Sequence, residues 1–207
     1  MIAIVDYGVG NLFSLKSSFG FLGADTAVTS DAAVIQAADR IVLPGVGAFG
    51  DATKKLKASG LEQVVLDQAR SGKPFLGICL GMQLLFERSF EYGEHPGLGL
   101  IPGSVRTMQG VVPADYKIPH IGWNALHFTQ DSPLWKYIRE GDCVYFVHSF
   151  YGTDCAEHTI ATTEYGAELT AAVAKGNVYG CQFHPEKSGS VGLNILRAFC
   201  ELEGGAR

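Results

Sequence analysis

The first half of the chain alternates short apolar runs with segments whose apolar residues recur at helical spacing. The strand-like runs are residues 2–5, 27–28, 41–43 and 73–76, and helical spacing is clearest over residues 12–22. This alternation is typical of a parallel sheet covered by helices, and runs that are apolar throughout indicate strands buried on both faces. The pattern therefore predicts an α/β fold with a mostly parallel sheet.

The second half has a different pattern. Residues 94–119 are rich in Gly and Pro. Three strand-like runs then follow with short connections: residues 144–147, 159–162 and 169–174. Such runs are typical of antiparallel strands, so we predict a mixed sheet flanked by helices, the last helix lying over residues 191–202. No repeat or linker interrupts the pattern, and we expect a single domain spanning residues 1–207.

Composition argues against several classes of function. The net charge is -5 and no run of Lys and Arg could form a basic patch, so we expect no nucleic-acid partner. We find no secretion signal and no apolar run long enough to span a bilayer. Five irregularly spaced cysteines give neither a disulfide framework nor a zinc motif, and the histidines at 95, 120, 127 and 158 lack ligand spacing. We therefore expect a cytoplasmic protein without a metal or cofactor.

Cys79 lies between a predicted strand and a helix predicted over residues 82–87. It is the centre of the motif Gly77-Ile78-Cys79-Leu80-Gly81. Glycines on either side remove Cβ atoms that would collide in a tight turn, so the motif indicates a nucleophile elbow with a thiol in place of a hydroxyl. A helix N-terminus favours the thiolate and leaves N–H groups free to bind an oxyanion. The alternative is a buried structural cysteine in a glycine-rich turn.

A second polar motif, His184-Pro185-Glu186, follows a strand predicted over residues 178–183. Pro185 ends the strand, so the two polar side chains project from a defined bend. Residues two apart on an extended segment face the same way, so Glu186 can orient His184 as the base that takes the thiol proton. A solvated turn would explain this motif alone. Together with the elbow, it favours a triad of Cys79, His184 and Glu186.

The segment Gly45-Val46-Gly47-Ala48-Phe49-Gly50 follows a predicted strand and matches the spacing of a dinucleotide-binding loop. That loop normally follows the first strand, and here the first strand leads into residues 6–11, which lack the third glycine. A loop that presents backbone N–H groups to an oxyanion suits the segment better. An ordinary glycine-rich loop is the alternative.

The elbow and the distant His-Pro-Glu motif together resemble class I glutamine amidotransferases, and the resemblance runs over essentially the whole chain. It implies the fold of that family, with a flavodoxin-like core. Further segments resemble one branch of the family, the glutaminase subunits of imidazole glycerol phosphate synthases in histidine biosynthesis. These segments are residues 6–11, 43–49, 122–124, 146–150 and 182–188.

The resemblance implies a reaction on L-glutamine. The Cys79 thiolate would attack the side-chain amide to form a γ-glutamyl thioester and release ammonia, while His184 transfers the protons and Glu186 orients it. The oxyanion would be held by the N–H of Leu80 and by an N–H near Val46. The glutamine pocket implied by the family consists of Gly47, Gln83, Glu91, His148, Ser149 and Phe150.

The resemblance also implies a partner that receives the ammonia. In this branch it is a (β/α)₈-barrel cyclase subunit, which forms a heterodimer with the glutaminase and converts the intermediate PRFAR to imidazole glycerol phosphate and AICAR. The residues that would face it are Asn11, Trp123, Asn124, Tyr145 and Lys187. Without the resemblance, Trp123 is as well explained as a core aromatic and Lys187 as a solvated residue.

Three alternatives remain open. The amidotransferase component of anthranilate or aminodeoxychorismate synthase shares the elbow and triad, but not Gly10-Asn11 or Gly122-Trp123-Asn124. A cysteine hydrolase or peptidase of related fold would release its amine to solvent and need no partner. A non-catalytic regulatory module is disfavoured because all three triad positions are filled.

Overall fold

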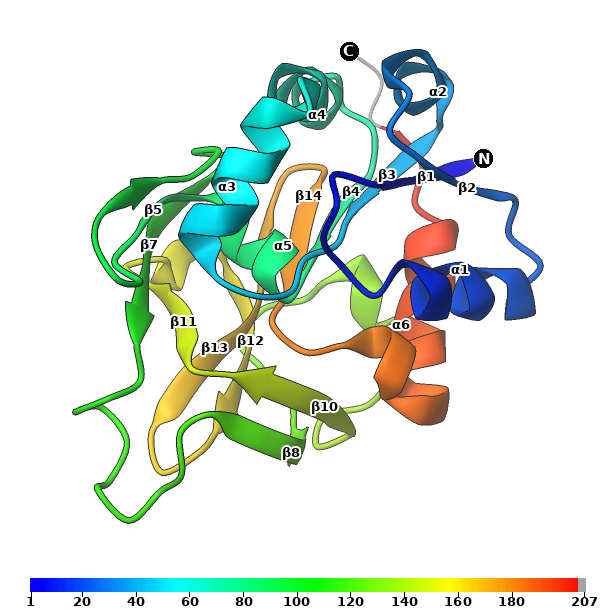
Figure 1. Cartoon of the computed structure of the whole chain (residues 1–207). Coiled ribbons are helices and arrows are strands. Elements are labelled where there is room, and N and C mark those ends of the chain that lie inside the picture. Colours follow the sequence, from blue (N-terminus) through cyan, green and yellow to red (C-terminus); the bar gives the residue numbers. More distant parts are fainter. Residues whose placement is uncertain (205–207) are drawn as a thin grey trace.

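The computed structural model describes residues 1–204, which contain an eight-stranded mixed sheet with helices on both faces and two smaller sheets (Figure 1). The strand order of the large sheet is β2-β1-β3-β4-β14-β13-β12-β9. Its parallel part comprises β1 (Ile2–Val5), β2 (Thr26–Thr29), β3 (Arg40–Leu43), β4 (Phe75–Ile78) and β14 (Val178–Cys181). Its antiparallel part comprises β13 (Glu168–Lys175), β12 (Thr159–Glu164) and β9 (His127–Phe128).

Helices cover both faces of this sheet, as Figure 1 shows. One face carries α1 (Leu12–Phe21) and α6 (Gly189–Cys200); the other carries α2 (Ala32–Ala37), α3 (Phe49–Ala58), α4 (Leu61–Arg70) and α5 (Leu80–Leu84). Side chains of β1 alternate between the two cores, since Ile4 packs with Phe19 and Phe199 while Val5 packs with the other group of helices. Burial on both sides explains why the strand is apolar throughout. Within residues 1–204, no helix has the length and apolar composition needed to cross a membrane.

The two smaller sheets lie beside the antiparallel part of the large one (Figure 1). One pairs β8 (His120–Ala125) with β10 (Cys143–His148). The other has the order β11-β7-β5-β6, with β11 (Phe150–Thr153), β7 (Ile101–Thr107), β5 (Phe86–Ser89) and β6 (His95–Pro96). Three short 3₁₀ helices complete the described chain: η1 (Pro133–Trp135), η2 (Ala156–His158) and η3 (Pro185–Lys187).

The predicted fold class is confirmed, but two local predictions are wrong, and one strand lies in a stretch for which no element was predicted. The helix predicted over residues 82–87 ends at Leu84, because the fully buried Phe86 already belongs to β5 and packs against Gly152. Residues 144–147 do form a strand, but it pairs with β8 outside the large sheet. The Gly- and Pro-rich stretch contains β7, in which Gly103 adopts a φ of 117° where the chain passes close to the Thr153 carbonyl.

The nucleophile elbow has the backbone that the motif predicts. Cys79 has φ 54° and ψ −113°, a strained conformation for a residue with a side chain. A Cβ at Gly81 would overlap the Leu43 carbonyl oxygen, and a Cβ at Gly77 would lie 2.6 Å from the Gly81 oxygen. Only glycine at both positions lets β4 turn into α5 this tightly.

A methyl group at Gly81 is therefore expected to destabilise the fold. We predict that Gly81→Ala lowers the free energy of unfolding by more than about 2 kcal/mol, because neither the elbow nor β3 can move without breaking the sheet. Urea denaturation measures the change. The matched control is Gly20→Ala in α1, where an added Cβ meets no atom within 4 Å and should stabilise the helix by about 0.5–1 kcal/mol. Equal unfolding midpoints for the two variants would contradict this account.

Candidate active site

Three neighbouring parallel strands place the predicted site residues at one edge of the sheet. The loop containing Val46 follows β3, Cys79 follows β4, and His184 follows β14. Parallel strands end at the same edge, which is where α/β folds commonly bind ligands. Residues separated by more than a hundred positions are thus brought together by strand order.

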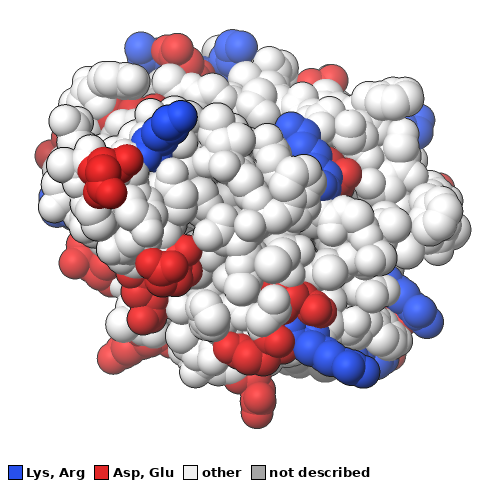
Figure 2. All heavy atoms as spheres, turned by 90° about the horizontal axis from the view of Figure 1, so that it is seen from below, with Lys and Arg blue, Asp and Glu red and all other residues white. Residues whose placement is uncertain are grey.

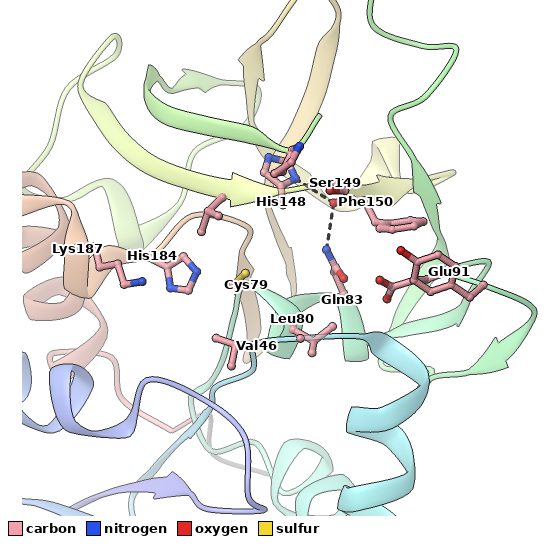
Figure 3. A pocket seen from close by; sticks show the side chains of 14 residues that line it. Val46, Cys79, Leu80, Gln83, Glu91, His148, Ser149, Phe150, His184 and Lys187 are labelled. Carbon is pink, nitrogen blue, oxygen red and sulfur yellow. Dashed lines mark hydrogen bonds between the residues drawn. The ribbon is translucent and has the colours of Figure 1, made fainter. Parts of the chain in front are cut away.

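Cys79 opens into a cavity of about 400 Å³ (Figure 3). The cavity is lined by Val46, Gly47, Cys79, Leu80, Gln83, Glu91, Tyr92, Pro119, Val147, His148, Ser149, Phe150, His184 and Lys187. All six residues predicted for a glutamine pocket are among them. Tyr92, Pro119 and Val147 were not predicted, because they come from loops and an edge strand whose positions no local motif indicates.

His184 and Glu186 form a buried hydrogen-bonded pair. His184 Nδ1 lies 2.8 Å from Glu186 Oε1, and the two side chains are 3% and 1% exposed. The contact is made by the turn of η3 and not, as predicted, by an extended segment: only His184 is extended. Glu186 Oε2 has no hydrogen-bond partner among the described residues, so His184 is the group that the carboxylate orients.

The charge of His184 is set by its neighbours. Burial by itself lowers the pKa of His184, but interaction with Cys79 and with the Glu186 carboxylate raises that pKa to about 9. A protonated imidazole beside a thiol favours the thiolate, which is the reactive form of cysteine. The site can therefore pair a thiol nucleophile with an imidazolium that can serve as the general acid.

Gln83 and Gln182 connect Cys79 with the opposite wall of the cavity. Gln83 Nε2 donates to the Phe150 carbonyl (3.1 Å) and to Gln182 Oε1 (3.0 Å), and Gln182 Nε2 lies 3.8 Å from the Cys79 sulfur. Gln182 was not among the predicted site residues. Its position directly before Phe183 and His184 was the available signal.

Glu91 contributes a carboxylate to the cavity wall. Its Oε2 accepts a hydrogen bond of 2.6 Å from the N–H of Phe49, the first residue of α3. A carboxylate at this end of a helix is stabilised by the helix dipole. The second oxygen stays available to a ligand.

The loop after β3 packs directly on the elbow. A Cβ at Gly45 would lie 2.7 Å from Gly81 N and 2.9 Å from Leu80 Cβ. Leu80 is the first residue of α5, so its N–H has no partner within the helix. Val46 is 42% exposed, and Gly47 adopts a φ of 95°. The loop after β3 and the start of α5 thus meet at the cavity that contains the thiol.

Of the residues predicted to face a partner, Lys187 lines the cavity. Trp123 is 62% exposed, which excludes a core role, and its ring lies 4.8 Å from that of Tyr145. Lys187 Nζ lies 5.9 Å from the Tyr145 ring and also lines the cavity. Asn124 belongs to β8 and is half-buried, and Asn11 stands just before α1. These positions form two groups, one around Trp123 and one at the start of α1.

Much of the face that carries β8 and β10 is free of charged side chains. Figure 2 shows this face with Lys, Arg, Asp and Glu gathered mainly toward its rim. Exposed apolar residues of this region include Ile118 and Ile121, which are 39% and 58% exposed. Within residues 1–204, no group of three His, Cys, Asp or Glu side chains could hold a metal ion.

Comparison with known proteins defines the family. The family glutamine amidotransferase class-I matches residues 3–201, and the chain belongs to this family. Among solved structures, a glutamine amidotransferase crystal structure has a TM-score of 0.74 at 20% identity and covers 97% of this chain and 98% of its own. A PurLQS structure from Thermotoga maritima has a TM-score of 0.73 at 19% identity, with 96% of each chain covered. At these identities the structures support the fold alone.

Curated relatives narrow the comparison to one branch of the family. The imidazole glycerol phosphate synthase subunit HisH of Caldanaerobacter subterraneus subsp. tengcongensis is 49% identical over 204 residues, covering 98% of both chains. The subunit of the same name from Lacticaseibacillus casei is 49% identical and covers 98% of this chain and 96% of its own. The subunit of the same name from Bacillus cereus is 48% identical over 200 residues and covers 96% of this chain and 93% of its own. The chain is thus an enzyme of the glutamine amidotransferase class, similar over its length to HisH subunits.

Removing the negative charge of Glu186 is expected to impair the reaction while leaving the fold intact. We predict that Glu186→Gln lowers kcat for glutamine hydrolysis about 100-fold or more, because the imidazolium loses its compensating charge and its tautomer is no longer fixed. Steady-state kinetics measures the change. The matched control is Glu91→Gln, in the same cavity, whose amide oxygen can still accept from Phe49 N–H. A similar loss of kcat in both variants would argue against the orienting role of Glu186.

Proposed function

We propose that this chain is the glutaminase subunit of a cytoplasmic imidazole glycerol phosphate synthase in L-histidine biosynthesis. One observation carries the chemical part of the proposal: Cys79, in the strained elbow, shares a cavity with His184, whose second ring nitrogen is engaged by Glu186. Identity of 49% over nearly the full length of HisH subunits supports the assignment to this synthase.

In the proposed reaction, the Cys79 thiolate attacks the side-chain carbonyl carbon of L-glutamine. His184 holds the thiol proton and donates it to the leaving nitrogen, so that ammonia departs and a γ-glutamyl thioester remains. The neutral His184 then accepts a proton from water, whose oxygen attacks the thioester and releases glutamate. Glu186 stabilises the imidazolium in both half-reactions because it is buried against the ring.

Negative charge that develops on the substrate oxygen needs donors on the side of the elbow. The N–H of Leu80 and an N–H near Val46 would supply them, because the two loops are in contact at Gly45 and Gly81. Such donors, fixed before the reaction, stabilise the tetrahedral intermediate more than they stabilise the substrate.

The rest of the cavity suits a small amino acid with a charged end. Its volume of about 400 Å³ is in the range of small-molecule sites. We assign the free oxygen of Glu91 to the α-ammonium group of glutamine, since Glu91 is the carboxylate that lines this cavity along with the polar side chains of Gln83 and Ser149. Gly47, His148 and Phe150 complete the proposed pocket.

Ammonia is useful to a synthase only if it reaches a second active site before it is protonated in water. We therefore propose a heterodimer with a (β/α)₈-barrel cyclase subunit that converts PRFAR to imidazole glycerol phosphate and AICAR. The partner would cover the mouth of the cavity and contact Asn11, Trp123, Asn124, Tyr145 and Lys187. Exposed Trp and adjacent Tyr are typical of the centres of protein interfaces.

The division of labour between the subunits is tested by Cys79→Ala in the assembled complex. We expect synthesis from glutamine to be lost, while synthesis from added ammonium salts continues at the wild-type rate, because the cyclase site is untouched. Formation of imidazole glycerol phosphate is measured with each nitrogen source. Loss of both activities in a complex that stays assembled would refute the proposed roles.

Dependence on the partner separates this proposal from a free-standing hydrolase or peptidase. The isolated chain should hydrolyse glutamine slowly and be stimulated when the cyclase and its substrate are added. Lys187→Ala should weaken both the binding of the cyclase and this stimulation. The matched control is Lys136→Ala, at the exposed position directly after η1. Glutaminase assays and binding titrations measure both effects. Full activity of the chain alone would overturn the proposal.

A further inference from the structure

Two buried histidines link β8 with the wall of the cavity. His120 lies opposite His148 in the β8–β10 pair, and His120 Nδ1 is 3.1 Å from His148 Nε2. The outer nitrogens are also engaged: His148 Nδ1 lies 2.9 Å from the Phe150 carbonyl oxygen, and His120 Nε2 lies 2.8 Å from Asn124 Oδ1. Asn124 Nδ2 donates to the Glu164 carbonyl (3.0 Å). We call the side chains of His120 and His148 the histidine pair.

The Phe150 carbonyl connects the histidine pair to the reacting thiol. Besides facing His148, it accepts from Gln83 Nε2, as the dashed lines in Figure 3 mark. Gln83 in turn bonds Gln182, which reaches the sulfur of Cys79. A change in the proton positions of His148 therefore affects the Phe150 carbonyl, which positions Gln83 and, through it, Gln182 beside the nucleophile.

Counting protons shows that the pair cannot satisfy all its contacts while it is neutral. Both carbonyl oxygens, of Phe150 and Glu164, can only accept, so His148 Nδ1 must carry a proton and Asn124 must turn its Oδ1 toward His120. His120 Nε2 must then also carry a proton. The central contact between the rings needs a further proton on one of them, and this gives the pair one positive charge.

Burial opposes that charge. It lowers the pKa of His120, and it lowers the pKa of His148 to about 3 with further contributions from His120 and His184. Lys187 lines the same cavity and is a further cation, besides protonated His184, that opposes a positive charge on the pair. The other titratable groups near the pair are the Tyr165 phenol, which donates to Lys117 O, and the Glu164 carboxylate, which accepts from Gly166 N–H. The pair is therefore neutral near pH 7, and one of its contacts is unsatisfied.

The neutral pair has three arrangements, and each leaves one contact unsatisfied. In the first, the Asn124 amide stands as described, both outer nitrogens carry protons, and no proton lies between the two rings. In the second, the amide stands as before, His120 donates to Asn124, His148 donates to His120, and the Phe150 carbonyl keeps only its donor from Gln83. With the amide reversed, Asn124 donates to His120, His120 donates to His148, and His148 donates to the Phe150 carbonyl. Asn124 Oδ1 then faces the Glu164 carbonyl, at a solvent-exposed position where an outside donor can bridge the two oxygens.

The His120 ring can transmit a change at Asn124 to His148 only through the positions of its protons. It is stacked between Phe146, with centroids 4.9 Å apart, and Tyr165, at 4.0 Å. The two rings hold its plane, so the proton positions on its nitrogens are what can change.

We propose that Asn124 sets the tautomer of His148 through His120, and that His120 and His148 are positioning residues. They hold the Phe150 carbonyl without an unpaired contact between the two rings only when the Asn124 amide is reversed. A donor offered by a docked partner to Asn124 Oδ1 and Glu164 O would favour the reversed amide. The partner's part in this proposal rests on the proposed function, whereas the link from Asn124 to His148 belongs to the chain alone.

The link can be measured by ¹⁵N NMR of the isolated chain labelled at histidine ring nitrogens, since the two neutral tautomers and the cation give different shifts. Asn124→Asp offers His120 an acceptor only, so His148 should carry its proton on Nε2, or the pair should become charged. Asn124→Leu offers His120 neither an acceptor nor a donor. His120 can then donate to His148, which should carry its proton on Nδ1. Exposed His127 serves as the internal reference.

Two further measurements separate positioning from damage to the fold. In the His120→Phe background, which keeps a stacked ring without nitrogens, Asn124→Asp should no longer alter the signals of His148. In the assembled enzyme, Asn124→Asp should raise KM for glutamine about tenfold relative to Asn124→Leu, as loss of one buried hydrogen bond would.

The same His148 tautomer in the Asp and Leu variants would overturn the proposal. So would an Asp effect on His148 that persists when position 120 is Phe. If the isolated chain behaves as expected but no cyclase binds it, the link within the chain stands and the proposed function fails.

Discussion

The close packing of three glycines at the ends of β3 and β4 is the constraint on which the site depends. Gly81 lies against the Leu43 carbonyl, Gly77 against Gly81, and Gly45 against the backbone of Gly81. This contact leaves Cys79 as the residue that must adopt a positive φ, and it brings the loop containing Val46 to the thiol. Backbone strain at the nucleophile is maintained because two buried strands meet there.

Besides this packing, the site depends on the charges around its two histidines. The imidazole of His184 would be neutral if burial alone acted on it, yet the neighbouring thiol and carboxylate favour the charged ring. His148 lines the same cavity but is buried without such partners, and its pKa moves in the opposite direction. The two histidines of one cavity therefore differ in charge because of what faces them, which suits one to proton transfer and the other to hydrogen-bonded positioning.

The cavity, the Trp123–Tyr145 ring pair and the histidine pair all include residues of β8 or β10. This two-stranded sheet contributes Trp123 and Tyr145 to the surface and His148 to the cavity wall. Alternation of side chains along a strand explains why neighbouring residues serve these two sides. A structural connection between the surface and the cavity suits the proposed function. In that function ammonia is the useful product, and hydrolysis without a receiving site wastes glutamine.

Local pattern was enough to predict the parallel strands, the first and last helices, the elbow at Cys79 and the bend at His184. Each depends on neighbours in the chain: apolar spacing, glycines that relieve a collision, or a proline that ends a strand. The resemblance to the family added the residues of the pocket wall. It included Gln182 in the segment 182–188 without assigning it a role, and it did not indicate Tyr92, whose place depends on how separate loops meet.

Only the tertiary structure decided that β10 pairs with β8, that Phe86 begins a strand, and that Trp123 is exposed. It also gave His120, which had been assigned no role, a buried place between Asn124 and His148. The physical reason is that strand pairing and burial depend on contacts between residues far apart in the chain, which periodicity does not record. The sequence by itself determined the chemistry that is available, and the fold decided which groups meet.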